Sequence, residues 1–388
     1  MSHKFFKPIK KYVSRNIAID RMKLTSKQFD RLTVLCGVYP MVAVKKHRVG
    51  EEDGWYYRID DIKRIFYSSA YEICNRNMKK SEKRNELIKV QQYARADKIC
   101  DEEINFVELV KQKYASFAQS LEDFGHSLRN LYFINMLAID NVREELNLFE
   151  DFLVERGLLN CGFLSKKGVY FSFTFEKIIV CWLMPYPGLN LSDLVEEKLE
   201  APNKLKCTFD FLDFEPLSED ESEEQTLDKN DPDKLDISLL KYSSPLLKIH
   251  LKLTLFKLEK LLPDTSVKTN KIFSGKKFCV AINSIKHHIE LAIKCCGGDI
   301  VDANSAEIIV AEVIDDLVPD IIYVQSQYIF DSLNQSKMLS FENYAVGKIC
   351  PSHISPFPNI LDTIDERALK ILSNKKKYDI LDRVEDLN

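Results

Sequence analysis

Apolar side chains recur at helical spacing in the first half of the chain and predict three packed helices. The first begins after Leu24, where Thr25 and Gln28 can form a capping box, and it ends at Gly37, which favours a left-handed stop. The three apolar faces consist of Phe29, Leu32, Leu35 and Cys36, of Leu121, Phe124, Leu128 and Leu131, and of Val142, Leu146, Phe149 and Leu153.

Strand-like patterns appear further along the chain. Residues 169–175 and 178–183 are rich in aromatic and β-branched side chains, and a polar break at 176–177 separates them, which predicts a β-hairpin. In 245–263 two periods compete, because positions 249 to 255 alternate as in a strand while 255, 258 and 262 have helical spacing. The length of this run and Pro245 at its first position favour a helix.

Strands and helices alternate in 272–357, which predicts a second domain with a small parallel sheet. The expected strands are 277–282, 307–313 and 321–324, and the expected helices are 285–296 and a segment that ends at Asn334. The expected fold class is α+β, with a mainly helical N-terminal domain that contains the β-hairpin, followed by a small α/β domain. We place these domains at 1–265 and 270–358, with a short C-terminal tail at 359–388.

Charge is distributed unevenly along the chain. The first fifty residues carry twelve Lys or Arg against two Asp, although the net charge of the whole chain is -4. Such a segment favours an anionic partner, most often RNA or DNA, and the capped helix indicates that part of the segment folds. The alternative is a disordered basic arm. From 213 to 236, eleven acids against two lysines predict a flexible insertion, with a mimic of nucleic acid as the alternative.

Composition excludes several classes of protein. With 388 residues and 45% hydrophobic content, the chain can form two or three folded domains. No run approaches the ~20 apolar residues of a membrane-spanning helix, and no apolar stretch follows the basic start. We therefore expect a soluble intracellular protein that does not bind membranes. Its ten cysteines are scattered without a CxxC pair, which favours reduced thiols.

The sequence contains none of the phosphate-loop, dinucleotide, nucleophile-elbow or zinc-protease motifs. One cluster has metal-ligating residue types, His287-His288 with Cys295-Cys296. Seven or eight residues of helix separate the two pairs by about 10 Å of rise, which is too far for one ion. We therefore expect no enzymatic activity, no metal and no other cofactor.

Four stretches resemble, in the same order, the signature of the pescadillo family. The first runs from YVSRN at 12–16 to LCGVYP at 35–40, and the second is WYYRIDDIK at 55–63. The third is YASF at 114–117 with the leucines at 121 and 128, and the fourth joins FLSKKGVYF at 163–171 to IVCWLMPY at 179–186. The family also has an apolar helix near 245–263, which implies that the acidic run is an insertion in one N-terminal domain.

The second domain resembles a BRCT domain, placed where the pescadillo family has one. The resemblance rests on FSG at 273–275, GGD at 297–299 and YIFDS at 328–332, and PSHISPF at 351–357 is similar to the family's exit from this domain. Tyr328 stands where most BRCT domains have Trp, so its hydroxyl needs a hydrogen-bond partner. Ala306-Glu307 replaces the usual Thr-His pair, and the sequence stops at Asn388 without the family's long charged tail.

The resemblance implies a non-enzymatic ribosome assembly factor of the nucleolus and nucleoplasm. It implies a scaffold that binds precursor ribosomal RNA in the pre-large-subunit particle and supports ribosomal RNA processing. It also implies a trimeric complex with a block-of-proliferation-like protein and a second β-propeller protein. The alternative function is a BRCT adaptor that binds phosphopeptides in DNA repair or cell-cycle control.

These functions suggest particular site residues. We expect ten cations to contact RNA phosphates: Lys7, Lys10, Lys11, Arg15, Arg21, Lys23, Arg31, Lys45, Lys46 and Arg48. Candidate anchors for protein partners are Tyr39, Pro40, Trp182 and Tyr186, although burial in the core is the stronger expectation for Trp182. By residue type alone, Ser284 and Lys294 could bind a phosphate in the BRCT-like domain.

Overall fold

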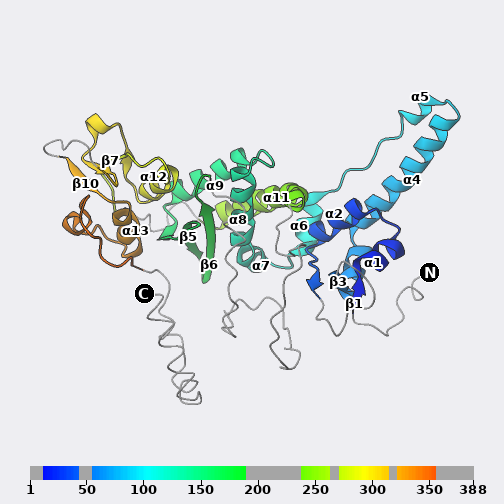
Figure 1. The fold of residues 1–388 in the computed structure, drawn as a ribbon, viewed down its shortest axis with the longest axis horizontal. Coiled ribbons are helices and arrows are strands. Elements are labelled where there is room, and N and C mark those ends of the chain that lie inside the picture. The colour runs from blue at the N-terminus through cyan, green and yellow to red at the C-terminus, as the bar shows by residue number, and fades with distance from the viewer. Residues whose placement is uncertain (1–11, 43–54, 189–236, 263–270, 314–320, 355–388) are drawn as a thin grey trace, which may run out of the picture.

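The computed structural model describes residues 12–42, 55–188, 237–262, 271–313 and 321–354. These residues form an elongated molecule of three lobes, and the long helix α11 (Ile237–Leu261) lies between the first two (Figure 1). We call residues 12–113 the N-terminal lobe, 114–188 the central lobe and 271–354 the C-terminal lobe. The predicted α+β fold class is confirmed.

The N-terminal lobe combines helices with a small antiparallel sheet of order β1-β3-β2. Its strands are β1 (Tyr12–Ser14), β2 (Met41–Val42) and β3 (Trp55–Arg58). Its helices are α1 (Arg15–Met22), α2 (Ser26–Cys36), α3 (Ile59–Phe66), α4 (Ser69–Lys89), α5 (Tyr93–Ala96) and α6 (Phe106–Lys113). Phe29 and Leu32 of α2 are fully buried in its core, as their spacing predicts.

The predicted capping box at the start of α2 is confirmed. The Thr25 hydroxyl accepts a hydrogen bond from the Gln28 amide at 3.3 Å, and the Gln28 side chain accepts one from the Thr25 amide at 2.9 Å. Gly37 ends the helix in the left-handed region, with φ at 64°. Helix α2 therefore begins and ends at residues whose own chemistry fixes those positions.

Replacing Thr25 by alanine should lower the free energy of unfolding by about 1 kcal/mol, because the Gln28 amide loses its acceptor. Urea denaturation measures the change. Thr25→Ser is the matched control, since it keeps the hydroxyl. If the serine variant lost as much stability as the alanine variant, the cap would not be the cause.

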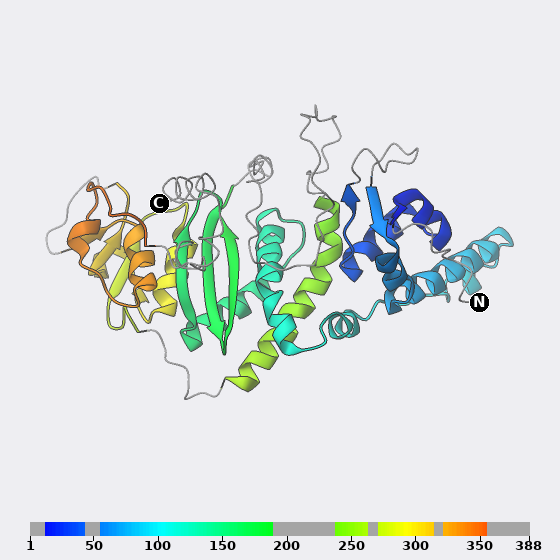
Figure 2. The ribbon, with the colours of Figure 1, turned by 90° about the horizontal axis from the view of Figure 1, so that it is seen from below.

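The central lobe places helices against a three-stranded antiparallel sheet of order β4-β5-β6, seen face-on in Figure 2. Its strands are β4 (Leu159–Leu164), β5 (Gly168–Phe175) and β6 (Ile178–Pro185), and its helices are α7 (Phe117–Glu122), α8 (Phe124–Met136) and α9 (Arg143–Arg156). The predicted hairpin is confirmed: Phe175 pairs with Ile178, and Glu176 takes a left-handed φ of 54° in the turn. The sequence patterns missed strand β4.

Helix α8 packs closely on β6 because residue 125 is glycine. A β-carbon at Gly125 would lie 2.1 Å from the Cys181 carbonyl oxygen, so any larger residue would push the helix off the strand. The apolar stripes predicted in this lobe are fully buried, as at Leu121 and Phe149. The stripe from Leu121 to Leu131 belongs to two helices rather than one, because α7 ends at Glu122 and α8 begins at Phe124. Trp182 of β6 packs edge-on against Phe149 in this core, with ring centroids 5.3 Å apart.

Helix α11 begins at Ile237, so the prediction that Pro245 occupies its first position is wrong. Proline lacks the amide hydrogen that would bond to the preceding turn, yet packing on two sides holds the helix together. Leu247, Leu251, Leu255 and Leu258 join the core of the central lobe, whereas Leu246, Ile249 and Leu253 pack in that of the N-terminal lobe. Two interleaved apolar faces explain the strand-like alternation in the sequence.

The C-terminal lobe contains the predicted parallel sheet, with strand order β10-β9-β7-β8. Its elements are β7 (Lys277–Val280), α12 (Lys286–Cys295), β8 (Asp299–Ile300), β9 (Ile308–Val310), β10 (Ile322–Val324) and α13 (Gln327–Asn334). Tyr328 is fully buried, and its hydroxyl donates to the Leu339 carbonyl at 3.3 Å. The expectation that this tyrosine fills the core and finds a partner is therefore confirmed.

The C-terminal lobe docks on the edge strand β4 of the central sheet. The Asn334 side chain accepts from the Gly162 amide at 3.0 Å and donates to the Gly162 carbonyl at 2.9 Å. The Leu164 amide donates to Nε2 of His353 at 3.1 Å, and His353 stacks on Phe163. These contacts pair the exposed backbone of β4, which would otherwise be an open sheet edge.

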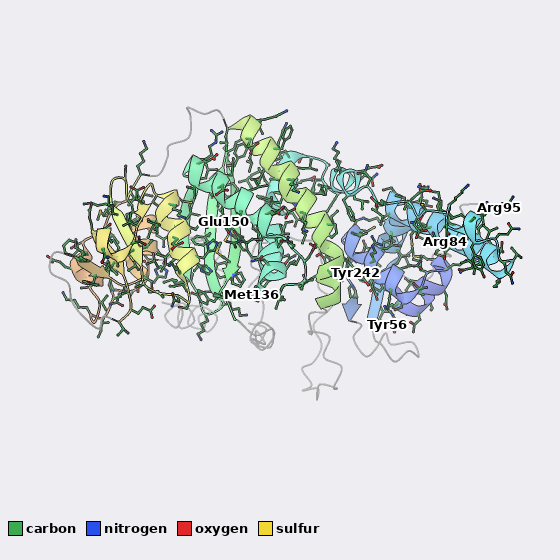
Figure 3. All side chains as sticks on the ribbon, turned by 90° about the horizontal axis from the view of Figure 1, so that it is seen from above. Tyr56, Arg84, Arg95, Met136, Glu150 and Tyr242 are labelled. Atoms are coloured by element: carbon green, nitrogen blue, oxygen red, sulfur yellow. The ribbon has the colours of Figure 1, made fainter. Side chains whose placement is uncertain are left out.

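A second set of contacts joins helix α12 to the central lobe. Nε2 of His287 lies 3.0 Å from a carboxylate oxygen of Glu150, which also accepts from the Tyr132 hydroxyl at 3.0 Å. Glu150 is labelled in Figure 3. One continuous core of buried side chains includes residues of both lobes. The domain boundaries placed at 265, 270 and 358, and the tail at 359–388, lie outside the described residues and stay predictions.

Candidate nucleic-acid interface

The described residues include four of the ten cations predicted to contact RNA: Arg15, Arg21, Lys23 and Arg31. Arg21, Lys23 and Arg31 are exposed, whereas Arg15 is partly buried. The other six lie outside the described residues: Lys7, Lys10, Lys11, Lys45, Lys46 and Arg48. The acidic run at 213–236 also lies outside them.

Arg15 is held inside the N-terminal lobe. Its guanidinium donates to both carboxylate oxygens of Asp30, at 2.8 and 2.9 Å, and to the Ser26 hydroxyl at 2.5 Å. The Arg15 side chain is only 22% exposed. Because these bonds tie the start of α1 to α2, Arg15 supports the scaffold that carries the other cations. Charge reversal at Arg15 would disturb that scaffold and is a poor test of RNA binding.

The turn from α1 to α2 presents exposed cations on ordered backbone. Lys23 ends α1 in the left-handed region, at φ 55°, and its amide hydrogen bonds to carbonyls of the last turn. Lys27 follows in the first turn of α2, and Arg31 lies one turn further along the same helix. Because Leu24 and Phe29 are buried beneath this turn, the backbone that carries Lys23, Lys27 and Arg31 is fixed.

Arg31 lies at a hollow of about 800 Å³ between α2, α4 and residues 101–106. Gln28 of α2 and Asn77 of α4 contribute to its lining, but so do four acidic side chains: Glu82, Asp101, Glu102 and Glu103. Burial raises the pKa of the Cys74 thiol at this hollow, so the thiol stays protonated. The mixed charge of the hollow makes it a poor receptor for a polyanion, and the exposed cations around it are the better candidates.

Helix α4 extends away from the N-terminal lobe as an arm, with α5 at its tip (Figure 1). The buried residues of α4, Ala70 and Tyr71, lie in its first turn. Cys74 and Met78 still pack against the core of the N-terminal lobe, but beyond Met78 core packing does not hold the helix, and a helix without packing is marginal in water. Its stability must therefore come from another contact.

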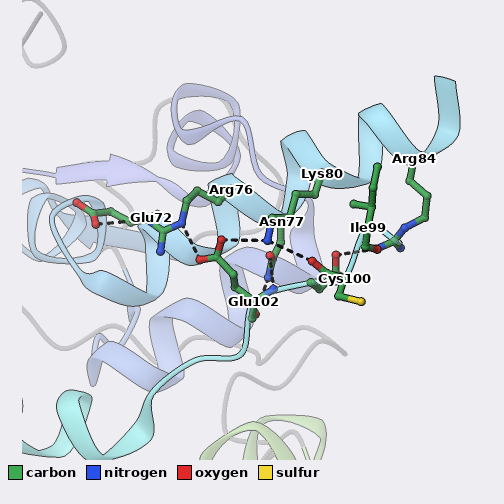
Figure 4. Close-up of polar contacts among 9 residues, drawn as sticks. Glu72, Arg76, Asn77, Lys80, Arg84, Ile99, Cys100 and Glu102 are labelled. Carbon is green, nitrogen blue, oxygen red and sulfur yellow. Dashed lines mark hydrogen bonds and ion pairs between the residues drawn. The ribbon is translucent and has the colours of Figure 1, made fainter. Parts of the chain in front are cut away.

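That contact is the chain that returns from the tip, residues 97–105, which we call the return segment (Figure 4). The Asn77 side chain donates to the Glu102 carbonyl at 2.8 Å and accepts from the Glu102 amide at 2.7 Å. Two further bonds run from Lys80 to the Cys100 carbonyl, at 3.1 Å, and from Arg84 to the Ile99 carbonyl, at 2.7 Å. The arm is thus braced along its length.

Ion pairs reinforce the brace. The Glu102 carboxylate lies 2.8 Å from Arg76 and 3.0 Å from Lys80, and Asp101 lies 3.0 Å from Arg84. Hydrogen bonds from Lys80 and Arg76 hold the pKa of Glu102 below its ordinary value. The acids of the return segment therefore neutralise one row of cations on α4, formed by residues 76, 80 and 84.

The arm carries a second set of cations that was not predicted from the sequence. Lys79, Lys83, Lys89 and Lys98 are exposed, and within the described residues no hydrogen bond or ion pair engages their ammonium groups. The available signal was the density of Lys and Arg at helical spacing in a stretch with few apolar positions. That signal lies outside the first fifty residues, where the charge excess is greatest.

The candidate protein anchors have different environments. Tyr39 is 79% exposed and Pro40 is partly exposed, so both can meet a partner. Tyr186 is partly buried and packs edge-on against His288. Trp182 is only 2% exposed, so it belongs to the core and cannot serve as an exposed anchor.

The structure does not bring Ser284 and Lys294 together. Both are exposed, but Ser284 precedes the first turn of α12 and Lys294 lies in its last turn. The helix from Lys286 to Lys294 alone corresponds to about 12 Å of rise, so the two residues lie at opposite ends of α12. The BRCT phosphopeptide alternative therefore gains no support from this pair.

The described residues contain no group of three or more His, Cys, Asp or Glu side chains that could hold a metal ion. His288 instead bonds to the Met184 carbonyl at 3.2 Å, and Cys295 and Cys296 are buried. The nine cysteines that the structure describes are all free thiols, as predicted for them. None of the described helices is long and apolar enough to cross a membrane.

Comparisons with known proteins bear on the whole chain. The family model for the pescadillo N-terminus matches residues 4–212, and a BRCT domain model matches residues 271–345. A pescadillo homologue of Brugia malayi is 25% identical over 96% of this chain and 79% of its own length. Homologues of Nematostella vectensis and Leishmania braziliensis are 23% and 24% identical, and the chain spans 79% and 61% of their respective lengths.

Proposed function

The chain belongs to the pescadillo family of ribosome biogenesis factors, and from that premise we propose that it acts as a non-enzymatic scaffold in large-subunit maturation. In this role it binds precursor ribosomal RNA and supports its processing within the pre-large-subunit particle. Members of the family are ribosome biogenesis factors and not known enzymes, which supports a role in binding rather than in catalysis.

The proposal includes protein partners. A block-of-proliferation-like protein and a second β-propeller protein complete a trimeric complex, which works in the nucleolus and nucleoplasm. Membership of the family supports this part of the proposal. The exposed Tyr39 beside Pro40 is the anchor best placed to meet such a partner, because a large exposed aromatic can fill a pocket on another protein.

One observation carries the RNA-binding part: exposed cations stand on a rigid scaffold at the α1–α2 turn. Lys23 and Arg31 are exposed while the Arg15–Asp30 pair and the capping box fix the backbone beneath them. Because the backbone is fixed, only the side chains lose conformational freedom when these cations contact phosphates. Such contacts position an RNA without reading its sequence.

Replacing Lys23 and Arg31 by glutamine should weaken the binding of the full chain to a structured RNA hairpin and reduce its salt dependence. Fluorescence anisotropy over about 50 to 200 mM salt measures both quantities. The slope of log K against log salt should fall in magnitude by about 1.5, because two phosphate contacts are lost. Gradient sedimentation should show less of the double variant with pre-large-subunit particles.

The matched control replaces Lys177 and Lys257 by glutamine; both are also exposed but lie on the hairpin turn and on α11. It removes the same charge and should leave the slope unchanged. If the wild-type chain bound the hairpin weakly and without salt dependence, the RNA-binding proposal would be wrong. If the control lost as much as the Lys23 and Arg31 variant, net charge rather than this surface would explain binding.

A further inference from the structure

The arm formed by α4 and α5 combines a rigid shaft with an unneutralised row of cations. It projects from the N-terminal lobe at the end of the molecule opposite the C-terminal lobe, and Arg84 and Arg95 mark its position in Figure 3. Its 21-residue helix is about 31 Å long. The return segment braces it through Asn77, Lys80 and Arg84, although within the described residues the helix packs against no core beyond Met78.

Like charges are aligned along this shaft. Residues 76, 80 and 84 form one basic row at a spacing of four, and Lys79 and Lys83 form a second row at the same spacing. Like charges at this spacing destabilise an isolated helix. The first row has counter-charges, because Glu102 pairs with Arg76 and Lys80 and Asp101 pairs with Arg84.

The second row forms no ion pair within the described residues. Lys79 and Lys83 are exposed, and neither forms an ion pair with the nearby acids Glu82 and Glu86. Lys89 continues the exposed cations toward the tip, and Lys98 adds another near the start of the return segment. The first row shows what these rows bind, namely carboxylate and carbonyl oxygens. Phosphate oxygens would satisfy the second row in the same way.

From this arrangement we infer that the arm binds the sugar–phosphate backbone of double-stranded RNA along its shaft. The inference rests on the proposed RNA-binding function and assigns it a second surface. Duplex RNA is favoured over single strands, because single-strand binding relies on stacking of bases on aromatic side chains. The one aromatic residue of α4, Tyr71, is buried, and the exposed Tyr93 lies at the tip.

The test compares the full chain with a variant in which Lys79, Lys83 and Lys89 are replaced by glutamine. A duplex RNA hairpin and a single-stranded RNA of the same length serve as probes, measured by fluorescence anisotropy across a salt series. The variant should bind the duplex roughly tenfold more weakly, and the magnitude of its log–log salt slope should fall by about 2 to 2.7. The control replaces the exposed Lys166, Lys177 and Lys257 and should match the wild type.

The outcomes separate the arm from the proposed function. If the wild type binds the duplex and the arm variant behaves like the control, the arm inference is wrong while RNA binding stands. If the wild type binds neither probe, the RNA-binding proposal itself fails. Equal losses on both probes would overturn the assignment to duplex RNA. Because the three lysines have no internal partners, circular dichroism should show an unchanged fold.

The tip of the arm provides a second check, since Val90 and Tyr93 are 61% and 58% exposed. These side chains suit a protein partner rather than a phosphate backbone. If replacing both by serine abolished association with pre-large-subunit particles while the lysine variant retained it, the arm would be a protein-docking element. That result would overturn the inference.

Discussion

Replacing Asp331 by alanine should lower the free energy of unfolding by about 3 to 5 kcal/mol, because four hydrogen-bond donors lose their acceptor in a buried site. Asp331 is fully buried in α13. Its carboxylate accepts from Nδ1 of His353 at 2.5 Å, from the Tyr344 hydroxyl at 3.0 Å and from the Gln327 amide at 2.9 Å. The Ile354 backbone amide also donates to it, at 3.0 Å.

The protonation state of Asp331 follows from these partners. Burial alone would raise the pKa of the Asp331 carboxyl, but the hydrogen bonds from His353, Gln327 and Ile354 outweigh burial and hold the pKa below its ordinary value. His353 also accepts from the Leu164 amide through Nε2, which requires a neutral ring with its proton on Nδ1. Asp331 therefore fixes the tautomer that lets His353 bind β4.

Two measurements check this prediction. Urea denaturation gives the loss of stability, and hydrogen exchange should show faster exchange of the Leu164 amide, because His353 loses its orientation. The control Asp302→Ala removes an exposed carboxylate from the same lobe and should change stability by less than about 0.5 kcal/mol. A loss of stability without faster exchange at Leu164 would mean that Asp331 supports α13 alone and not the docking on β4.

Signals that lie close together in the sequence predicted the fold well. Thr25, Gln28 and Gly37 act within a turn or two, so the bounds of α2 could be read directly. The polar break at 176–177 likewise fixed the hairpin. The bounds of α11 could not be predicted, because its two apolar faces belong to different lobes and the sequence does not separate them.

Contacts between distant residues limited the prediction of the candidate site. The excess of cations in the first fifty residues was visible, but the partner of Arg15 is Asp30, and only the packing of α1 on α2 brings the two together. The arm was missed for a related reason. Beyond Met78 its shaft lacks an apolar stripe, and the return segment that replaces core packing there acts through side chains paired with backbone groups 15 to 25 residues away.

Acidification from about pH 7.5 to about pH 5 should remove about 4 kcal/mol from the free energy of unfolding, through two buried histidines. Burial, reinforced by the charge of Lys113, lowers the pKa of His250 from 6.5 to about 4. Burial also lowers the pKa of His288 to about 4. Below pH 6.5 the unfolded chain therefore binds more protons than the folded one, so stability falls as pH falls toward 4.

His250 holds three helices together, which is why its protonation matters. Its Nε2 lies 2.9 Å from the Ser120 hydroxyl of α7, and its Nδ1 lies 2.8 Å from the Ser127 hydroxyl of α8. The ring stacks on Tyr114 at 4.6 Å between centroids. His288 bonds to the Met184 carbonyl through Nε2, while its buried Nδ1 has no partner among the described residues. A second proton on either ring would therefore be desolvated.

Urea denaturation at about pH 7.5 and about pH 5 tests this account. The proteins to compare are the wild type, His250→Gln, His288→Gln and the double variant. Each single variant should lose about 2 kcal/mol less than the wild type on acidification, and the double variant should keep only the smaller contribution of His126, whose pKa burial also lowers. Carboxylates with lowered pKa, such as Asp123 and Asp331, act mainly below this pH window. An unchanged pH dependence in the double variant would contradict the assignment, because the protons would then bind elsewhere.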